Sequence, residues 1–70
     1  MKQYNTLECA LVNNQCDHIR ITLYGNNEKC MNGSQWIDYF KKYDADALNS
    51  EVYMNESESD WYDYDLWFID

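Results

Sequence analysis

The clearest hydrophobic pattern in the chain lies in "HIRITLYG", residues 18–25. Ile19, Ile21 and Leu23 alternate with polar or aromatic neighbours, so one face of an extended segment is apolar. This alternation predicts a strand with one buried face. A second alternating run, "YNTLECALV", precedes it, and the polar stretch "NNQCD" between them has the length of a hairpin turn. The sequence therefore predicts that the first two strands pair antiparallel.

A helical period follows in "SQWIDYFKKYDADAL", where apolar residues recur at spacings of three and four. The stretch before it, "NNEKCMNGS", has the composition of a loop, and Asn32 or Ser34 is a residue type that caps a helix start. The pattern predicts a helix that begins between Asn32 and Gln35 and packs Trp36 and Phe40 against a sheet.

The C-terminal segment "SEVYMNESESDWYDYDLWFID" contains two alternating runs separated by the polar "NESESD". This arrangement predicts a second hairpin, with strands near residues 51–54 and 61–69. Residues on alternate sides of a strand face opposite ways. The last strand is predicted to turn Tyr62, Tyr64, Leu66 and Phe68 toward the helix, and Trp61, Asp63, Asp65, Trp67 and Ile69 away from it.

These elements give the order β-β-α-β-β in a single domain, residues 1–70. The most economical architecture is α+β, with a small antiparallel sheet of about four strands and one helix packed on one face. The other face of such a sheet meets water or a partner.

Charge is distributed unevenly along the chain. Residues 1–35 carry equal numbers of acidic and basic side chains, whereas residues 36–70 carry ten acids against Lys41 and Lys42, which accounts for the net charge of -8. Such an asymmetry creates a directional electrostatic field. Twelve aromatic residues among 70 argue against a disordered acidic tail, because such tails contain few aromatics.

Acids and aromatic rings are concentrated together between Ser50 and Asp70. Seven carboxylates are interleaved with six rings, and no lysine or arginine lies among them. Because rings favour burial and acids favour water, the segment indicates a recognition surface. Asp63 and Asp65 are two residues apart, so on an extended strand they would lie about 7 Å from each other. A tryptophan flanks them on either side. The predicted partner-binding residues are Glu56, Glu58, Asp60, Trp61, Asp63, Asp65 and Trp67.

Catalytic and metal chemistry find little support in the sequence. His18 is the only histidine, and no serine or cysteine has a sequence context that pairs it with a base. The stretch "DADALNSE" places leucine where a calcium loop requires an oxygen ligand. We expect neither an enzyme nor a bound metal or cofactor.

The three cysteines predict free thiols, because their number is odd and no C-x-x-C pair occurs. A bridge between Cys16 and Cys30 stays open if their strands pair. The segment "MKQYNTLECALVNN" lacks the pattern of a signal peptide, and no run approaches the roughly 20 apolar residues of a membrane span. We therefore expect a cytoplasmic, monomeric protein.

The charge predicts a basic partner and not nucleic acid itself. Phosphates would be repelled by the acidic half, and the few basic residues do not provide the usual attraction to them. Carboxylates along a strand have a spacing comparable to that of neighbouring phosphates, and tyrosine and tryptophan supply apolar anchors. The sequence therefore indicates a protein that mimics nucleic acid.

A short acidic domain, rich in asparagine and tyrosine and free of proline, resembles the small inhibitors that phages and mobile elements carry against host defence. These include anti-CRISPR proteins and nucleic-acid-mimicking antirestriction proteins. The stretch "NGSQWIDY", from Asn32 to Tyr39, is similar to the glycine followed by Trp-Ile-Asp of some antirestriction proteins. The resemblance implies an inhibitor, acting in the cytoplasm of the infected host cell, that binds a CRISPR effector complex or a restriction enzyme where nucleic acid binds.

Two alternatives remain at this stage. The acidic face suits an adaptor or antitoxin that docks a basic partner without mimicking nucleic acid. The outward tryptophans also suit a homodimer interface, but Asp63 and Asp65 would then crowd their symmetry mates without a cation on this strand. We rank the homodimer below partner binding.

Overall fold

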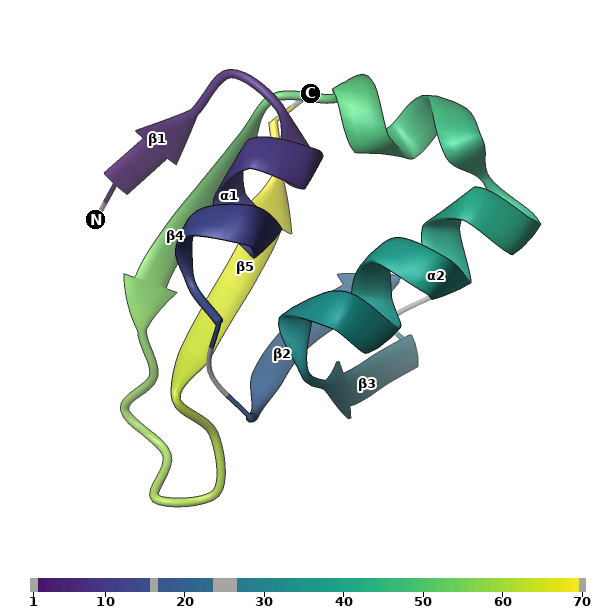
Figure 1. Cartoon of the computed structure of the whole chain (residues 1–70). Coiled ribbons are helices and arrows are strands. Elements are labelled where there is room, and N and C mark those ends of the chain that lie inside the picture. The colour runs from purple at the N-terminus through teal and green to yellow at the C-terminus, as the bar shows by residue number, and fades with distance from the viewer. Residues whose placement is uncertain (1, 16, 24–26, 70) are drawn as a thin grey trace.

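The structure, a computed structural model, describes residues 2–15, 17–23 and 27–69 as an α+β fold (Figure 1). A five-stranded sheet has the strand order β1-β4-β5-β2-β3. Two α-helices lie on the same side of this sheet (Figure 1). The elements are β1 (Lys2–Tyr4), α1 (Leu7–Asn13), β2 (Ile19–Leu23), β3 (Asn27–Met31), α2 (Gly33–Tyr43), the 3-10 helix η2 (Ala45–Asn49), β4 (Val52–Glu56) and β5 (Tyr64–Phe68).

The sheet is mixed, and the expectation of a purely antiparallel sheet is wrong. Strands β4 and β5 form the predicted C-terminal hairpin, with Met54 opposite Leu66. Strand β2 lies on the other side of β5 and runs parallel to it, with Ile21 opposite Leu66. Parallel neighbours require a long crossover connection, which here passes through β3, α2, η2 and β4.

The predicted N-terminal hairpin is also wrong, because most of its first strand is helix α1. Leu7, Ala10 and Leu11 are fully buried, and their spacing of three and four fits a helix as well as alternation fits a strand. Thr6 caps the helix, and its hydroxyl accepts a hydrogen bond from the Cys9 N–H at 3.1 Å. The antiparallel partner of β2 is instead β3, which lies in a stretch with the composition of a loop.

Helix α2 begins where the sequence predicts. The Asn32 side chain accepts from the Gln35 N–H at 2.8 Å, and the Gln35 side chain accepts from the Asn32 N–H at 3.1 Å. This reciprocal pair is a capping box, which satisfies two backbone donors at the helix start. Trp36 and Phe40 are buried, as expected. The α-helix ends at Tyr43, which is 65% exposed, and a 3-10 turn then buries Ala47 and Leu48.

The core fills the space between the helices and one face of the sheet. Trp36 donates its indole N–H to the Ile19 carbonyl at 2.8 Å, so the ring is both packed and hydrogen-bonded. Gly33 allows α2 to approach α1 closely, because an added Cβ there would lie 2.8 Å from the Leu11 carbonyl oxygen. The buried apolar residues are Leu7, Ala10, Leu11, Ile19, Ile21, Trp36, Phe40, Ala47, Leu48, Val52, Met54 and Leu66.

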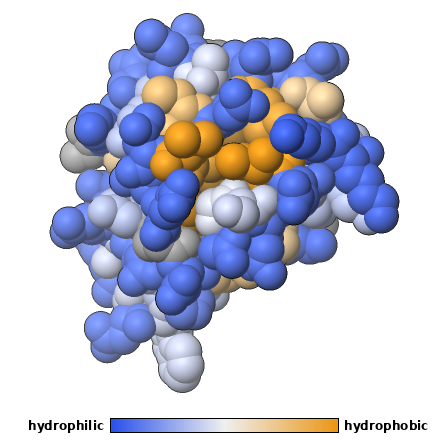
Figure 2. Space-filling view, in the orientation of Figure 1, coloured by the Kyte–Doolittle hydropathy of each residue, from blue (hydrophilic) through white to orange (hydrophobic). Residues whose placement is uncertain are grey.

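The helix-covered side is mostly hydrophilic, with an apolar patch near its middle (Figure 2). Among the described residues, no helix combines the length and the apolar composition needed to cross a membrane.

Candidate functional site

The opposite side of the sheet, which we call the outer face, is not covered by any helix of the described residues (Figure 1). Its side chains alternate with the buried apolar ones, because neighbours along a strand point to opposite faces. Its main residues come from the three central strands and are Arg20, Thr22, Tyr53, Asn55, Asp65 and Trp67.

An ion pair lies at the centre of the outer face. Arg20 on β2 is opposite Asp65 on β5, and its Nε and Nη2 atoms donate to the two carboxylate oxygens at 2.6 and 2.9 Å. Asp65 is only 8% exposed, and the Ser57 hydroxyl donates to it at 3.1 Å. The hydrogen bond to Asp65, more than any other interaction, raises the pKa of Arg20 above its ordinary value. The cation that the C-terminal segment lacks is therefore supplied by β2.

Two further groups hold the Arg20 guanidinium. Its central carbon lies 4.6 Å from the centre of the Tyr62 ring, and its Nη1 atom lies 3.6 Å from the Glu28 carboxylate. Cations are attracted to the face of an aromatic ring. The prediction that Tyr62 turns toward the helix is wrong, because β5 begins only at Tyr64 and Tyr62 contacts Arg20 of the outer face.

The predicted ladder of outward carboxylates is absent. Asp63 precedes β5 and accepts a hydrogen bond from the His18 backbone N–H at 3.1 Å, with the His18 Nδ1 at 3.6 Å. Asp65 does lie on the outer face, but it is buried and hydrogen-bonded to Arg20. Trp61 lies in a turn and does not flank the strand. Asp65 is thus buried in an ion pair, whereas the Asp63 carboxylate stays exposed and accepts a hydrogen bond from the His18 backbone.

Serine side chains stabilise the turn that precedes β5 and that keeps Asp63 out of the strand. The Ser59 N–H donates to the Ser57 hydroxyl, and the Trp61 N–H donates to the Ser59 hydroxyl, both at 3.2 Å. Serine side chains favour such local turns over continued strand. Figure 1 shows this connection, residues 57–63, projecting beyond the end of the sheet. We call it the acidic loop.

The other predicted site residues near this loop are exposed. Glu56 ends β4, Glu58 and Asp60 lie in the acidic loop, and none of the three forms an ion pair within the described residues. Trp61 is 81% exposed. This end of the molecule therefore carries uncompensated negative charge beside an exposed indole.

Trp67 is the predicted aromatic residue that lies on the outer face itself. It is 40% exposed and stands opposite Tyr53, which is 37% exposed. Cross-strand aromatic pairs stabilise a sheet and also present a rigid apolar surface. Tyr53 is not among the site residues predicted from the sequence, although its alternation with Val52 and Met54 in "EVYMN" was the available signal.

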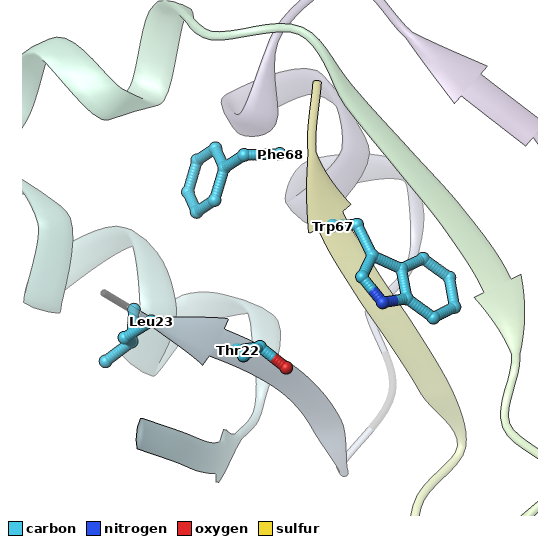
Figure 3. Close-up of a pocket in the computed structure, with 4 residues that line it drawn as sticks. All are labelled: Thr22, Leu23, Trp67 and Phe68. Atoms are coloured by element: carbon cyan, nitrogen blue, oxygen red, sulfur yellow. The ribbon is translucent and has the colours of Figure 1, made fainter. Parts of the chain in front are cut away.

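Two hollows border Trp67. A polar hollow of about 280 Å³ is lined by Arg20, Asn55, Glu56, Glu58, Asp65 and Trp67. An apolar notch of about 210 Å³ lies between Thr22, Leu23, Trp67 and Phe68, where β2 and β5 diverge past their last paired residues (Figure 3). Both are smaller than the roughly 300 to 1,000 Å³ of typical small-molecule sites. Their size suits single side chains of a partner.

The remaining reactive groups do not extend this site. Among the described residues, no three histidine, cysteine, aspartate or glutamate side chains form a group suited to a metal ion. Cys9 and Cys30 are free thiols, and burial raises the pKa of Cys30 above its ordinary value. The bridge left open between Cys16 and Cys30 involves a residue outside the described ranges.

Comparison of the chain with protein-family models, with curated proteins and with solved structures gives no match. Within the chain, the stretch from Asn32 to Tyr39 has a structural explanation. Asn32 and Gln35 cap α2, Gly33 permits the contact with α1, and Trp36 lies in the core. These residues are accounted for by folding.

Proposed function

We propose that this chain is an acidic protein-binding module that docks onto a basic partner protein through the outer face and the acidic loop. The observation that supports this most strongly is the exposed pair of Tyr53 and Trp67 on a helix-free sheet face. Tyrosine and tryptophan dominate the energetics of many protein interfaces, especially when hollows lie beside them. The pair supplies apolar anchors that charge alone does not.

Charge determines the kind of partner. Glu56, Glu58 and Asp60 are exposed beside this face and unpaired within the described residues, while Arg20 is neutralised by Asp65. A partner with a positive surface is attracted to this end of the molecule, and the attraction increases the association rate. Binding should weaken as salt rises, because exposed charges are screened over about 8 Å at physiological ionic strength.

A capture experiment tests this function. The tagged chain is incubated with cell lysate, and bound proteins are eluted with increasing salt. The variant Tyr53→Ser with Trp67→Ser, which keeps the net charge, should lose the retained proteins, whereas Tyr43→Ser, at the exposed end of α2 and outside both surfaces, should keep them. Retention of the same proteins by both variants, in the same salt range, would show that adhesion is nonspecific and that the outer face is not a docking surface.

A second candidate is the inhibitor that the resemblance implies, a nucleic-acid mimic that occupies the basic groove of a CRISPR effector complex or restriction enzyme. The exposed acids at alternate positions, Glu56, Glu58 and Asp60, support it, although Asp63 and Asp65 are occupied internally. Competition separates the two candidates. A mimic and nucleic acid exclude each other from the partner, whereas an adaptor or antitoxin that binds elsewhere leaves nucleic-acid affinity unchanged.

A further inference from the structure

We propose that the polar hollow beside Trp67 receives one arginine side chain of the partner. This inference rests on the proposed docking function and specifies the chemistry of one contact within it. The hollow is distinct from the rest of the outer face because an indole, two unpaired acids and an amide line the same small space.

The charge within the hollow favours a cationic occupant. Three carboxylates and one guanidinium line it. Asp65 accepts from the Nε and Nη2 atoms of Arg20, so these two charges offset each other. Glu56 and Glu58 remain, and neither has an ion-pair partner among the described residues. An anionic or neutral occupant would leave this charge uncompensated, whereas a cation offsets it.

The indole favours arginine over lysine. Trp67 is 40% exposed, and tryptophan is the aromatic residue that attracts cations most strongly. A planar guanidinium stacks on an indole and donates two parallel hydrogen bonds to a carboxylate, whereas an ammonium is a more strongly hydrated point charge. Arg20 already shows both contacts within this protein, with Tyr62 and with Asp65. The hollow offers the same pair of contacts to a second arginine.

Asn55 adds a polar group to the hollow. It is half-buried on β4, opposite Asp65. Its side-chain amide makes no hydrogen bond with another described residue. The amide oxygen is an acceptor for a guanidinium N–H. The hollow therefore has hydrogen-bond acceptors from β4, β5 and the acidic loop, and the Trp67 indole forms its aromatic side.

Nuclear magnetic resonance titration tests this site with small probes. N-acetyl-arginine amide is added to the isotopically labelled chain, and N-acetyl-citrulline amide, which has a similar shape without the charge, is the matched control. We expect saturable shifts of the Trp67 indole N–H and the Asn55 amide with the arginine probe only. Equal shifts with citrulline, or no shifts at these two groups, would overturn the proposal.

Paired variants locate the probe. Trp67→Ala should weaken arginine-probe binding by about threefold to tenfold, because it removes the cation-aromatic contact, whereas Trp61→Ala should leave it unchanged. Glu58→Gln should weaken binding by up to about fivefold, the range of an exposed ion pair, and Asp60→Asn in the same loop should have no such effect. Equal losses within either pair would show diffuse attraction to the acidic surface. In that case the hollow is excluded, while the capture experiment with the Tyr53 and Trp67 variant still decides the docking function.

Discussion

Arg20 and Asp65 stand opposite each other on parallel strands β2 and β5, 45 residues apart in sequence, and are joined by two hydrogen bonds of 2.6 and 2.9 Å. This pair connects the C-terminal hairpin to the β2–β3 hairpin across the middle of the sheet. It also explains how an acid can be buried in a segment that has no cation of its own.

Removing either partner of this pair should destabilise the fold. Asp65→Asn or Arg20→Met leaves the other group without its counter-charge, so each variant should have a lower free energy of unfolding than the wild type. The double variant Arg20→Met with Asp65→Leu should recover most of that loss, because no unpaired charge remains. Urea denaturation measures all three. Additive losses in the double variant would contradict a direct pairing.

The same pair predicts how stability depends on pH. The hydrogen bond to Asp65 raises the Arg20 pKa, so the guanidinium holds its proton more tightly in the folded chain than in the unfolded chain. Its contribution is fully present below the ordinary arginine pKa and is lost only as pH rises through the higher folded value. From neutral pH upward, the Arg20 contribution should therefore be lost only in strongly alkaline solution. A difference between the wild type and Arg20→Met that disappears near neutral pH would contradict this.

The contact between the helices at Gly33 gives a second stability prediction. An added Cβ would lie 2.8 Å from the Leu11 carbonyl oxygen, a backbone atom that moves only if α1 moves. Gly33→Ala should cost about 1 to 3 kcal/mol through overpacking, even though alanine favours helix more than glycine does. Ser34→Ala is the matched control, since Ser34 is exposed on the same helix turn. Thermal melts should show a loss only for the Gly33 variant.

Thiol reactivity follows from burial. Desolvation raises the pKa of Cys30, and the thiolate is the nucleophilic form, so Cys30 should react slowly with iodoacetamide. Cys9 is exposed and should react faster at the same mildly alkaline pH. Peptide mapping by mass spectrometry follows the two sites separately. Faster modification of Cys30 in the folded chain would contradict its placement in the sheet.

Sequence patterns predicted the elements whose signals are local. Alternation identified β2 and the hairpin of β4 and β5, and the apolar period with Asn32 as cap identified α2. Helix α1 was missed because Leu7, Ala10 and Leu11 belong to a short run in which both periods fit. Strand β3 is at the sheet edge, and edge strands need no apolar alternation because they are less buried.

The candidate site was predicted only in part. Trp67 and the exposed acids Glu56 and Glu58 line one hollow. Alternation and charge in the sequence had indicated these three residues as site residues, but not the hollow. Asp63 is hydrogen-bonded to the His18 backbone, and Asp65 is hydrogen-bonded to Arg20. The parallel pairing of β2 with β5 brings these residues together, and neither strand's sequence contains a pattern that predicts it. Tertiary pairing thus buries Asp65, and it holds the exposed Asp63 carboxylate against the His18 backbone.

Neighbouring residues on β5 provide the last prediction, which separates the core from the docking face. Leu66 is 1% exposed and faces the helices, whereas Trp67 is 40% exposed on the outer face. Leu66→Asp should unfold the chain because it buries an unpaired charge. Trp67→Asp places the same aspartate side chain one residue further along the strand, where water reaches it. This variant should keep the far-ultraviolet circular dichroism spectrum of the folded chain and should no longer capture the basic partner. A chain unfolded by Trp67→Asp would show that the indole stabilises the sheet and is not available as a binding anchor.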